Sequence, residues 1–260
     1  MIQAAESAFP TMQTPSVLVI GGAGYFGSML VAELLENTPA HLFIGGRNRK
    51  RVEEFCRAAP MRLTPLEVDL HRSESVDAAL ANVKLAICAA GPFQGLPTTL
   101  VELCLQRGVD YIDLSDDRAY VSRVRELAGA AGACPVAVCS GWSAVPALSG
   151  LLARIAVESL SSVDSLYIQI APGNRFPRSV GTVSSLLSCV GRPFALWENR
   201  QWRTVSGWSE PRDFDFPDPV GRRRGYLVDV PDHEIFPALF AAGRVEFSVG
   251  SDIGFLNHAM

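Results

Sequence analysis

The chain has 260 residues, of which 48% are hydrophobic and 19% charged, and its formal net charge is −4. This length accommodates two modest domains, each with enough apolar material for a core. A mildly acidic chain has no electrostatic attraction for nucleic acid or for an anionic membrane, so we exclude both as partners. The composition favours a protein that handles a small-molecule substrate.

Targeting and redox features are absent from the sequence pattern. No lysine or arginine precedes Arg47, so a secretory signal would lack its basic start. No apolar run reaches the roughly 18 residues that a membrane-spanning helix needs. The six cysteines form no C-x-x-C pair and no zinc-type spacing with histidine. We therefore expect a cytoplasmic protein without a bound metal.

After an aperiodic stretch at residues 1–15, which we predict to be a flexible tail, apolar strands and helical patterns alternate. The predicted strands cover residues 17–20, 41–44, 61–68, 85–90, 109–114 and 135–139. The predicted helices cover residues 26–36, 48–58, 73–81 with Ser73 as N-cap, 98–106 and 117–131. This alternation specifies an α/β fold, a Rossmann doubly wound parallel sheet, over residues 16–145. Right-handed crossovers bring the carboxyl ends of the strands to one edge, where open α/β sheets bind ligands.

The pattern changes in residues 146–260, which we assign to a second domain for substrate binding and dimerisation. Strand-like runs occur at residues 165–171, 225–230 and 244–249, and a hairpin is predicted at 194–205. Residues 209–225, rich in proline, aspartate and arginine, are predicted to form a long loop. These features indicate an α+β domain built on a mixed or antiparallel sheet. Two hairpin tryptophans are candidates for a homodimer contact or for core packing: Trp197 and Trp202.

A glycine-rich loop follows the first predicted strand and opens the first helix. Gly22, Gly24 and Gly27 have the G-x-G-x-x-G spacing of dinucleotide-binding loops, with Tyr25 and Phe26 before the last glycine. The first glycine permits a tight turn, the second lets the backbone approach a pyrophosphate, and the third lets helix and strand pack closely. Free N–H groups at the helix start then bind the pyrophosphate. The loop therefore predicts a dinucleotide site.

The end of the second strand selects the cofactor. NAD sites usually place an acidic residue there for the ribose 2′-hydroxyl, whereas this chain has Arg47 and Asn48. An arginine suits the 2′-phosphate of NADP(H), which would also offset the unfavourable positive charge at a helix start. We therefore predict NADP(H) as the cofactor. Asp69 is equally compatible with a contact to the adenine amine and with a turn. Further cofactor contacts are predicted at Ala90, Gly91 and Pro92.

Catalytic and substrate residues are sought at the same sheet edge. Asp113 and Asp116 follow the fifth strand, where a carboxylate can donate a proton or orient a substrate amine. Helix capping is the competing interpretation for Asp116. Trp142, after the sixth strand, is placed either beside the nicotinamide or in packing. Arg175 and Arg178 are candidates for binding substrate carboxylates, with exposed surface positions as the alternative.

Other dehydrogenase mechanisms lack their residues. The two lysines are Lys50 and Lys84, and neither has a tyrosine four residues before it. This excludes the Tyr-x-x-x-Lys pair of short-chain dehydrogenases and leaves few candidates for a Schiff base. His233 is a candidate acid or base, with a loop position without a catalytic role as the favoured alternative. The run Arg222-Arg223-Arg224 is interpreted as a solvated loop.

These motifs together resemble the saccharopine dehydrogenase-like proteins of the saccharopine reductase type. The resemblance is carried by VLVIGGAGYFG at 17–27, GGRN at 45–48, AAGPF at 89–93, GVDYIDLSD at 108–116, SGWSAVPALS at 140–149 and, more loosely, YLVDVP at 226–231. It implies an NADP(H) Rossmann domain joined to an α/β domain for substrate binding and dimer contacts. It also implies reduction of an imine, or oxidation of a secondary amine, in an amino-acid-like substrate. Relatives usually continue further, so the second domain is expected to be truncated at its C-terminus.

Two alternatives stay open at this point. The same scaffold supports reduction of a C=C or C=O bond, because a fold does not fix its chemistry. A non-catalytic NADP(H)-binding redox sensor is also compatible with the sequence, since none of the predicted proton donors stands out. Turnover of NADPH with an imine or carbonyl substrate separates an enzyme from a sensor.

Overall fold

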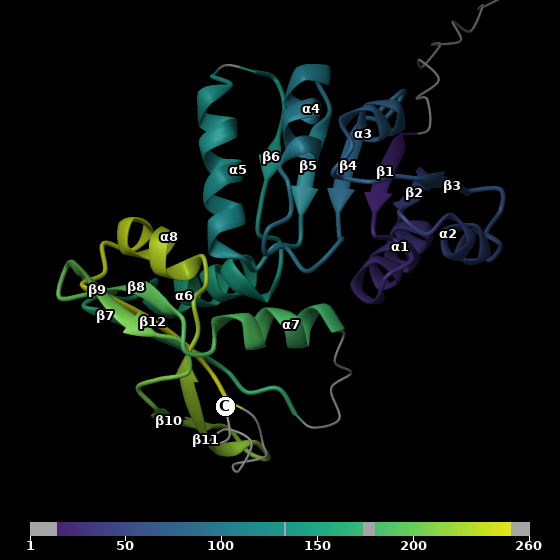
Figure 1. Ribbon diagram of the computed structural model, residues 1–260. Helices are drawn as coiled ribbons and strands as arrows, with labels where there is room; N and C mark the ends of the chain where they lie inside the picture. Colours follow the sequence, from purple (N-terminus) through teal and green to yellow (C-terminus); the bar gives the residue numbers. More distant parts are fainter. Residues whose placement is uncertain (1–14, 133, 174–179, 251–260) are drawn as a thin grey trace, which may run out of the picture.

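The computed structural model describes residues 15–132, 134–173 and 180–250. This part of the chain forms two sheets (Figure 1). Strands β1 to β6 make the first sheet, and strands β7 to β12 make the second. The predicted flexible tail, apart from Pro15, lies outside the described residues, as do Arg175, Arg178 and the C-terminal end.

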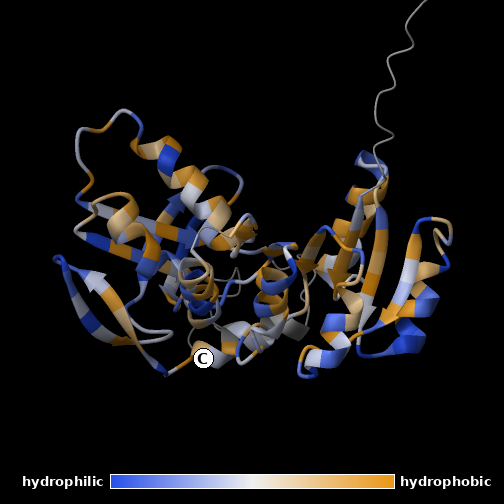
Figure 2. Ribbon diagram, turned by 90° about the horizontal axis from the view of Figure 1, so that it is seen from above, coloured by the Kyte–Doolittle hydropathy of each residue, from blue (hydrophilic) through white to orange (hydrophobic). Residues whose placement is uncertain are grey.

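The first sheet is parallel and doubly wound, as predicted, with strand order β3-β2-β1-β4-β5-β6. Its central strand β1 is apolar on both faces, and Leu18 and Val19 in it are fully buried. Such continuous apolar runs suit a sheet that is covered on both sides. Figure 2 shows strands of this sheet as mostly hydrophobic. The strands are β1 Ser16–Ile20, β2 His41–Gly46, β3 Leu63–Glu67, β4 Leu85–Cys88, β5 Asp110–Asp113 and β6 Val138–Cys139.

Helices connect these strands close to the predicted positions. They are α1 Tyr25–Asn37, α2 Arg49–Cys56, α3 Ser73–Ala79, α4 Thr99–Arg107 and α5 Arg118–Ala130. Asn48 and Asp117 cap α2 and α5, because their side chains accept hydrogen bonds from backbone N–H groups of the first turn. Gly108 ends α4 with φ of 70°, in the left-handed region that favours glycine. The prediction for Ser73 is wrong: it is the first residue of α3, and the residue before it occupies the cap position without a side-chain bond.

The second sheet has the order β10-β11-β12-β8-β9, and β7 adds to β12. The pairing of β7 with β12 is parallel and the other pairings are antiparallel, so the sheet is mixed. A π-helical turn at Ala144–Leu148 and helix α6 lead from the first sheet into it. The other elements are α6 Ser149–Val157, β7 Ser165–Ile170, α7 Val180–Cys189, β8 Pro193–Glu198, β9 Gln201–Ser206, β10 Arg212–Phe216, β11 Gly221–Leu227, α8 Asp232–Leu239 and β12 Arg244–Val249.

The predicted loop at residues 209–225 is wrong, because this segment forms the hairpin of β10 and β11. Its arginines are strand residues that pair across the hairpin. Arg222 and Arg224 both bind the Asp213 carboxylate, the latter with an Nε–Oδ1 distance of 2.8 Å. Cross-strand ion pairs therefore stabilise a segment whose local composition resembles a loop.

One arginine joins the two sheets. The Arg118 guanidinium, at the start of α5, donates to the carbonyl oxygen of Ala195 on β8 at 2.8 Å. It also pairs with Asp229 and with Glu234 on α8. Its side chain is only 15% exposed, so these contacts lie in a partly desolvated interface. Helix α7 lies across the carboxyl edge of the first sheet (Figure 1), where loops of that sheet contact it.

Among the described residues, no helix is both long and apolar enough to cross a membrane. In the same part of the chain, no group of histidine, cysteine, aspartate and glutamate side chains is arranged to hold a metal ion.

Candidate cofactor and active site

The tight turn of the phosphate loop is made at Gly21, one residue before the predicted position. Gly21 has φ of 79°, and its N–H donates to the carbonyl oxygen of Gly45 at 2.8 Å. A Cβ on Gly21 would lie 2.8 Å from the backbone nitrogen of Ala90. The position directly after β1 therefore has no room for a side chain. Gly22 instead faces Ile44, where an added Cβ would come within 3.0 Å of a side-chain methyl.

Gly27 meets its predicted requirement, and the approach of a pyrophosphate to Gly24 stays a prediction. Gly24 is the N-cap of α1, and its N–H donates to the Gly21 carbonyl oxygen at 2.8 Å. A Cβ on Gly27 would collide with that same carbonyl oxygen. Helix α1 can therefore approach the end of β1 only with glycine at this position.

The start of α1 is a free anion-binding end. Gly24 provides no side-chain cap, and the first turn has no acidic residue. Its N–H groups and the positive end of the helix dipole are thus available to a phosphate. Tyr25 and Phe26 are partly exposed beside it and pack edge to face, with ring centroids 5.1 Å apart. This arrangement fits the pyrophosphate of a dinucleotide.

Four basic residues follow β2: Arg47 in the turn, and Arg49, Lys50 and Arg51 at the start of α2. The three arginines differ in their contacts. Arg49 pairs with Glu53 one turn along α2, at 2.7 Å. The Nη2 of Arg51 donates to the carbonyl oxygen of Ala23, in the phosphate loop, at 2.9 Å. Arg47 is exposed and has no ion pair or hydrogen bond within the described residues. It is therefore the arginine whose guanidinium is free for a 2′-phosphate.

The remaining predicted cofactor positions have defined local roles. Asn48 caps α2 by accepting from the Arg51 N–H at 3.1 Å. Asp69 accepts from the His71 N–H at 3.1 Å and so forms a turn. The loop at Ala90, Gly91 and Pro92 follows β4 at the ligand-binding edge and includes a cis Gly91–Pro92 bond. The turn uses Asp69 Oδ1, and the contact of Asp69 with the adenine amine stays a prediction.

Asp113 has a structural role in the described residues. It is fully buried, and its carboxylate accepts from the N–H groups of Ser115 and Gly141 and from the hydroxyl of Ser140. Burial raises the pKa of this carboxyl, while the three hydrogen bonds oppose the rise. The loops after β5 and β6 are held together by these contacts. The three hydrogen bonds give Asp113 a structural role at this edge, and a catalytic role of Asp113 or Asp116 stays a prediction.

Asp116 belongs to a polar cluster that the sequence did not indicate. Ser185 on α7 donates to Asp116 Oδ2 at 3.4 Å and accepts from the Gln94 amide nitrogen at 2.9 Å. The three residues come from the loop after β5, from helix α7 and from the loop after β4. Burial, and to a lesser extent the charge of neighbouring Asp117, raises the pKa of Asp116. A carboxyl with a raised pKa suits proton transfer near neutral pH.

Trp142 lies at the same edge, on the loop after β6. Its side chain is 60% exposed, and its backbone N–H donates to the Asp113 carbonyl oxygen at 2.9 Å. The packing alternative for Trp142 is therefore disfavoured, because the indole ring is open to solvent. Arg175 and Arg178, predicted to bind substrate, lie outside the described residues.

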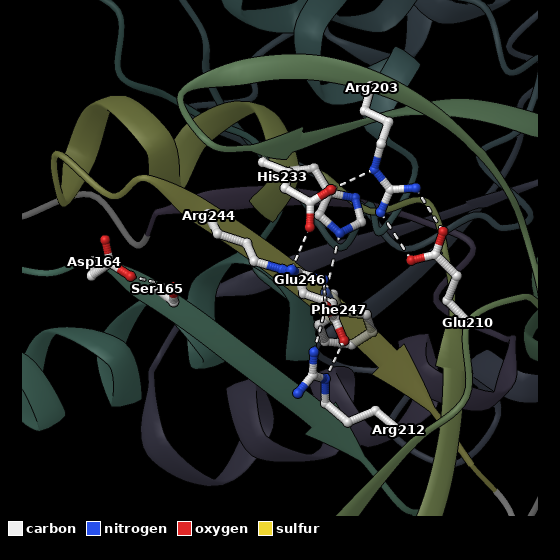
Figure 3. Close-up of polar contacts among 10 residues, drawn as sticks. Asp164, Ser165, Arg203, Glu210, Arg212, His233, Arg244, Glu246 and Phe247 are labelled. Atoms are coloured by element: carbon white, nitrogen blue, oxygen red, sulfur yellow. Dashed lines mark hydrogen bonds and ion pairs between the residues drawn. The ribbon is translucent and has the colours of Figure 1, made fainter.

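A second group of charged residues, drawn in Figure 3, lies on the second sheet. Glu246 is buried and accepts from Arg212 and Arg244, each at 2.7 Å. Arg203 pairs with Glu198 and Glu210 at 2.6 Å. Each of these three arginines has a carboxylate partner. The cluster therefore stabilises the sheet and offers no unpaired cation for a substrate carboxylate.

The predicted loop position of His233 is wrong. This residue lies in α8 and is fully buried. Its Nε2 accepts from the Phe247 N–H at 3.1 Å (Figure 3), and its ring stacks on Phe194. Burial lowers its pKa, so the imidazole is neutral and structural. The acid or base alternative for His233 is disfavoured, because the ring is buried and its Nε2 is occupied by the Phe247 N–H.

Comparisons with known proteins follow the same division of the chain. Residues 17–138 match the family model of the saccharopine dehydrogenase NADP binding domain. A relative described as a probable mitochondrial saccharopine dehydrogenase-like oxidoreductase, from Arabidopsis thaliana, is 25% identical over 207 residues. That alignment covers 72% of this chain and 45% of the relative.

A solved structure shows the same fold. Apo saccharopine dehydrogenase (L-Glu forming) from Saccharomyces cerevisiae aligns with a TM-score of 0.68 and 15% identity. The alignment covers 91% of this chain and 55% of the yeast enzyme. The chain thus spans about half the length of the relatives that it matches.

The fold and the phosphate loop define an NADP(H)-binding protein of the doubly wound α/β class. Residues 17–138 of the first domain are similar to the saccharopine dehydrogenase NADP binding domain, and the predicted resemblance to saccharopine dehydrogenase-like oxidoreductases is confirmed.

Proposed function

We propose that this protein is an NADP(H)-dependent oxidoreductase that reduces an imine, or oxidises a secondary amine, in an amino-acid-like substrate. The observation that carries the proposal is the uncapped start of α1 beside the unpaired Arg47. A pyrophosphate fits the first feature, and a 2′-phosphate fits the second. The bond type is what the resemblance to saccharopine dehydrogenase-like proteins implies.

Different residues at the carboxyl edge of the first sheet bind the cofactor and transfer the proton. The N–H groups of the first turn of α1 hold the pyrophosphate, and Arg47 selects the phosphorylated ribose. When bound, the cofactor supplies a hydride to the substrate or accepts one from it. Trp142 gives a flat apolar surface beside the reacting ring, and Asp116 holds the proton that the substrate nitrogen needs. Substrate binds at the carboxyl edge of the first sheet, which α7 lies across (Figure 1).

Steady-state turnover tests the proposal. NADPH oxidation is followed at 340 nm with imines formed from glyoxylate, pyruvate or 2-oxoglutarate and a panel of amines and amino acids. Turnover that requires both the carbonyl compound and the amine supports action on a C–N bond. Turnover with the carbonyl compound alone identifies a C=O reductase, and turnover only with unsaturated substrates identifies a C=C reductase.

A non-catalytic NADP(H) sensor is the second candidate, and one observation favours it. Asp113, the carboxylate placed directly at the end of β5, is fully engaged in structural hydrogen bonds. A sensor binds NADPH tightly and turns over no member of the substrate panel, so binding and turnover measured on the same preparation separate the two candidates.

A further inference from the structure

Gln94, Ser185 and Asp116 form a hydrogen-bonded cluster in which each residue donates to the next. The Gln94 amide N–H donates to the Ser185 oxygen at 2.9 Å, so the single hydroxyl proton of Ser185 is left for Asp116 Oδ2, 3.4 Å away. A hydroxyl that donates to a carboxylate stabilises the ionised form of that carboxylate. Ser185 therefore acts on the charge of Asp116.

The hydrogen-bonded cluster of Gln94, Ser185 and Asp116 lies on the side of the sheet where the nicotinamide is expected. Gln94 follows β4 and Asp116 follows β5, in the half of a doubly wound sheet that lies beyond the strand-order switch at β1 and β4. A dinucleotide crosses that switch point, with its adenosine half over β1 to β3. The turn that holds Arg47 lies on the adenosine side, so Asp116 lies on the nicotinamide side.

The charges around Asp116 are few. Asp117 precedes α5 and is the acidic neighbour that raises the pKa of Asp116 together with burial. The sequences of α7, of the loop at residues 89–98 and of the loop at residues 140–145 contain no charged residue. Among the described residues, burial and Asp117 raise the pKa of Asp116, while a hydrogen bond from its own backbone N–H and the Ser185 hydroxyl lower it. Ser185 is the side chain in this set that comes from the second domain.

We propose that Asp116 carries the proton for the substrate nitrogen and that Ser185, delivered by the second domain, is its positioning residue. This inference rests on the proposed function. Reduction of an imine adds one hydride to carbon and one proton to nitrogen. Asp116 gives the proton from Oδ1, is left as a carboxylate that accepts from Ser185 through Oδ2, and takes its next proton from solvent. Amine oxidation reverses these transfers.

A titration of the protein without substrate tests the coupling. Aspartate is labelled with ¹³C at the side-chain carboxyl, and the Asp116 signal is identified by its loss in Asp116→Asn. We expect an Asp116 pKa above the ordinary range, a further rise in Ser185→Ala, and a return to the wild-type value in Ser185→Thr. Ser188→Ala is the matched control, because Ser188 lies on the same helix and donates to the Ser185 carbonyl oxygen. An unchanged Asp116 titration in Ser185→Ala overturns the positioning role.

Kinetics with a defined probe, Δ1-pyrroline-2-carboxylate, test the proton transfer. Asp116→Asn should lower the rate of NADPH oxidation by roughly 100-fold or more at unchanged NADPH affinity. The rate should fall as the pH rises through the Asp116 pKa, and Ser185→Ala should move that fall to higher pH. Wild-type rates in Asp116→Asn overturn the proposal. Failure of the proposed function is distinct: wild-type protein then binds NADPH without turnover, while the NMR titration still decides whether Ser185 controls Asp116.

Discussion

The Nη2 of Arg51 lies 2.9 Å from the carbonyl oxygen of Ala23 and joins helix α2 to the phosphate loop. Arg47, four residues earlier, has no such partner within the described residues. The two arginines therefore have different relationships to the cofactor. Arg51 holds the shape of the loop that every dinucleotide uses, whereas Arg47 is free for the group that distinguishes NADPH from NADH.

Replacing Arg51 should weaken both cofactors together. In Arg51→Ala the phosphate loop loses a charged hydrogen bond, and we expect the dissociation constants for NADPH and NADH to rise by about tenfold each. Calorimetric titration with both nucleotides measures the change. Arg49→Ala is the matched control, because Arg49 pairs with Glu53 on the surface of the same helix and should leave both affinities unchanged. A loss confined to NADPH would assign Arg51 to the 2′-phosphate instead.

A methyl group at Gly27 should disrupt the loop. Gly27→Ala forces the start of α1 away from the Gly21 carbonyl oxygen, and we expect destabilisation of about 1–3 kcal/mol with loss of measurable NADPH binding. Urea denaturation and calorimetry give the two readouts. Gly129→Ala in α5 enters open space and should instead stabilise by up to about 1 kcal/mol. Equal stability of the two variants would show that α1 can shift without cost.

The contact between the two sheets should depend on Arg118. Arg118→Ala removes the guanidinium that donates to the Ala195 carbonyl oxygen and to the Asp229 and Glu234 carboxylates, and we expect a loss of about 2 kcal/mol of stability. Scanning calorimetry should show the two domains unfolding in separate transitions. Arg107→Ala removes an exposed pair with Asp77 and should cost less than about 1 kcal/mol, without splitting the transition. A single, unshifted transition in Arg118→Ala contradicts the interface role.

The first sheet could be predicted because its signals are local. Each strand is a short apolar run that ends in small or polar residues, and each following helix has its own periodicity. The tight turn of the phosphate loop was predicted one residue late, at Gly22. Only the contact between Gly21 and the Ala90 backbone reveals which glycine makes the turn, and that contact joins distant parts of the sequence.

The second domain and the polar cluster could not be predicted in the same way. The β10–β11 hairpin is stabilised by Arg224 and Asp213, which lie 11 residues apart and face each other only after the strands pair. Ser185 and Asp116 are 69 residues apart, and nothing in the serine-containing sequence of α7 marks that helix as a cover for the sheet edge. Asp113 was assigned to catalysis from its position alone, whereas two of its three donors belong to the distant loop at Ser140 and Gly141.

The buried Asp232 should make stability depend on pH. This first residue of α8 has no exposed surface, and neither carboxylate oxygen accepts a hydrogen bond within the described residues. Burial raises its pKa from 3.8 to about 7. Because the folded pKa is the higher one, the stabilising effect of the neutral acid is complete below pH 4 and is lost as the pH rises towards 7.

Asp232→Asn should remove this dependence, because the amide stays neutral at every pH. We expect the variant to be more stable than wild type at pH 8, by roughly 2–4 kcal/mol, and similar to it at pH 4. Urea denaturation between pH 4 and pH 8 measures the difference. Asp215→Asn, at an exposed position, should keep the wild-type profile. Parallel profiles for wild type and Asp232→Asn would show that water or another group compensates the buried charge.

Calorimetric titration of wild type and Arg47→Ala with NADPH and NADH tests the cofactor assignment most directly. Wild type should bind NADPH more tightly than NADH, and the variant should lose at least tenfold in NADPH affinity with NADH binding unchanged, because a charged contact to the 2′-phosphate is removed. Equal NADPH affinity in the two proteins would contradict the assignment of Arg47. Failure of the wild-type protein to bind either nucleotide would contradict the account of the whole site.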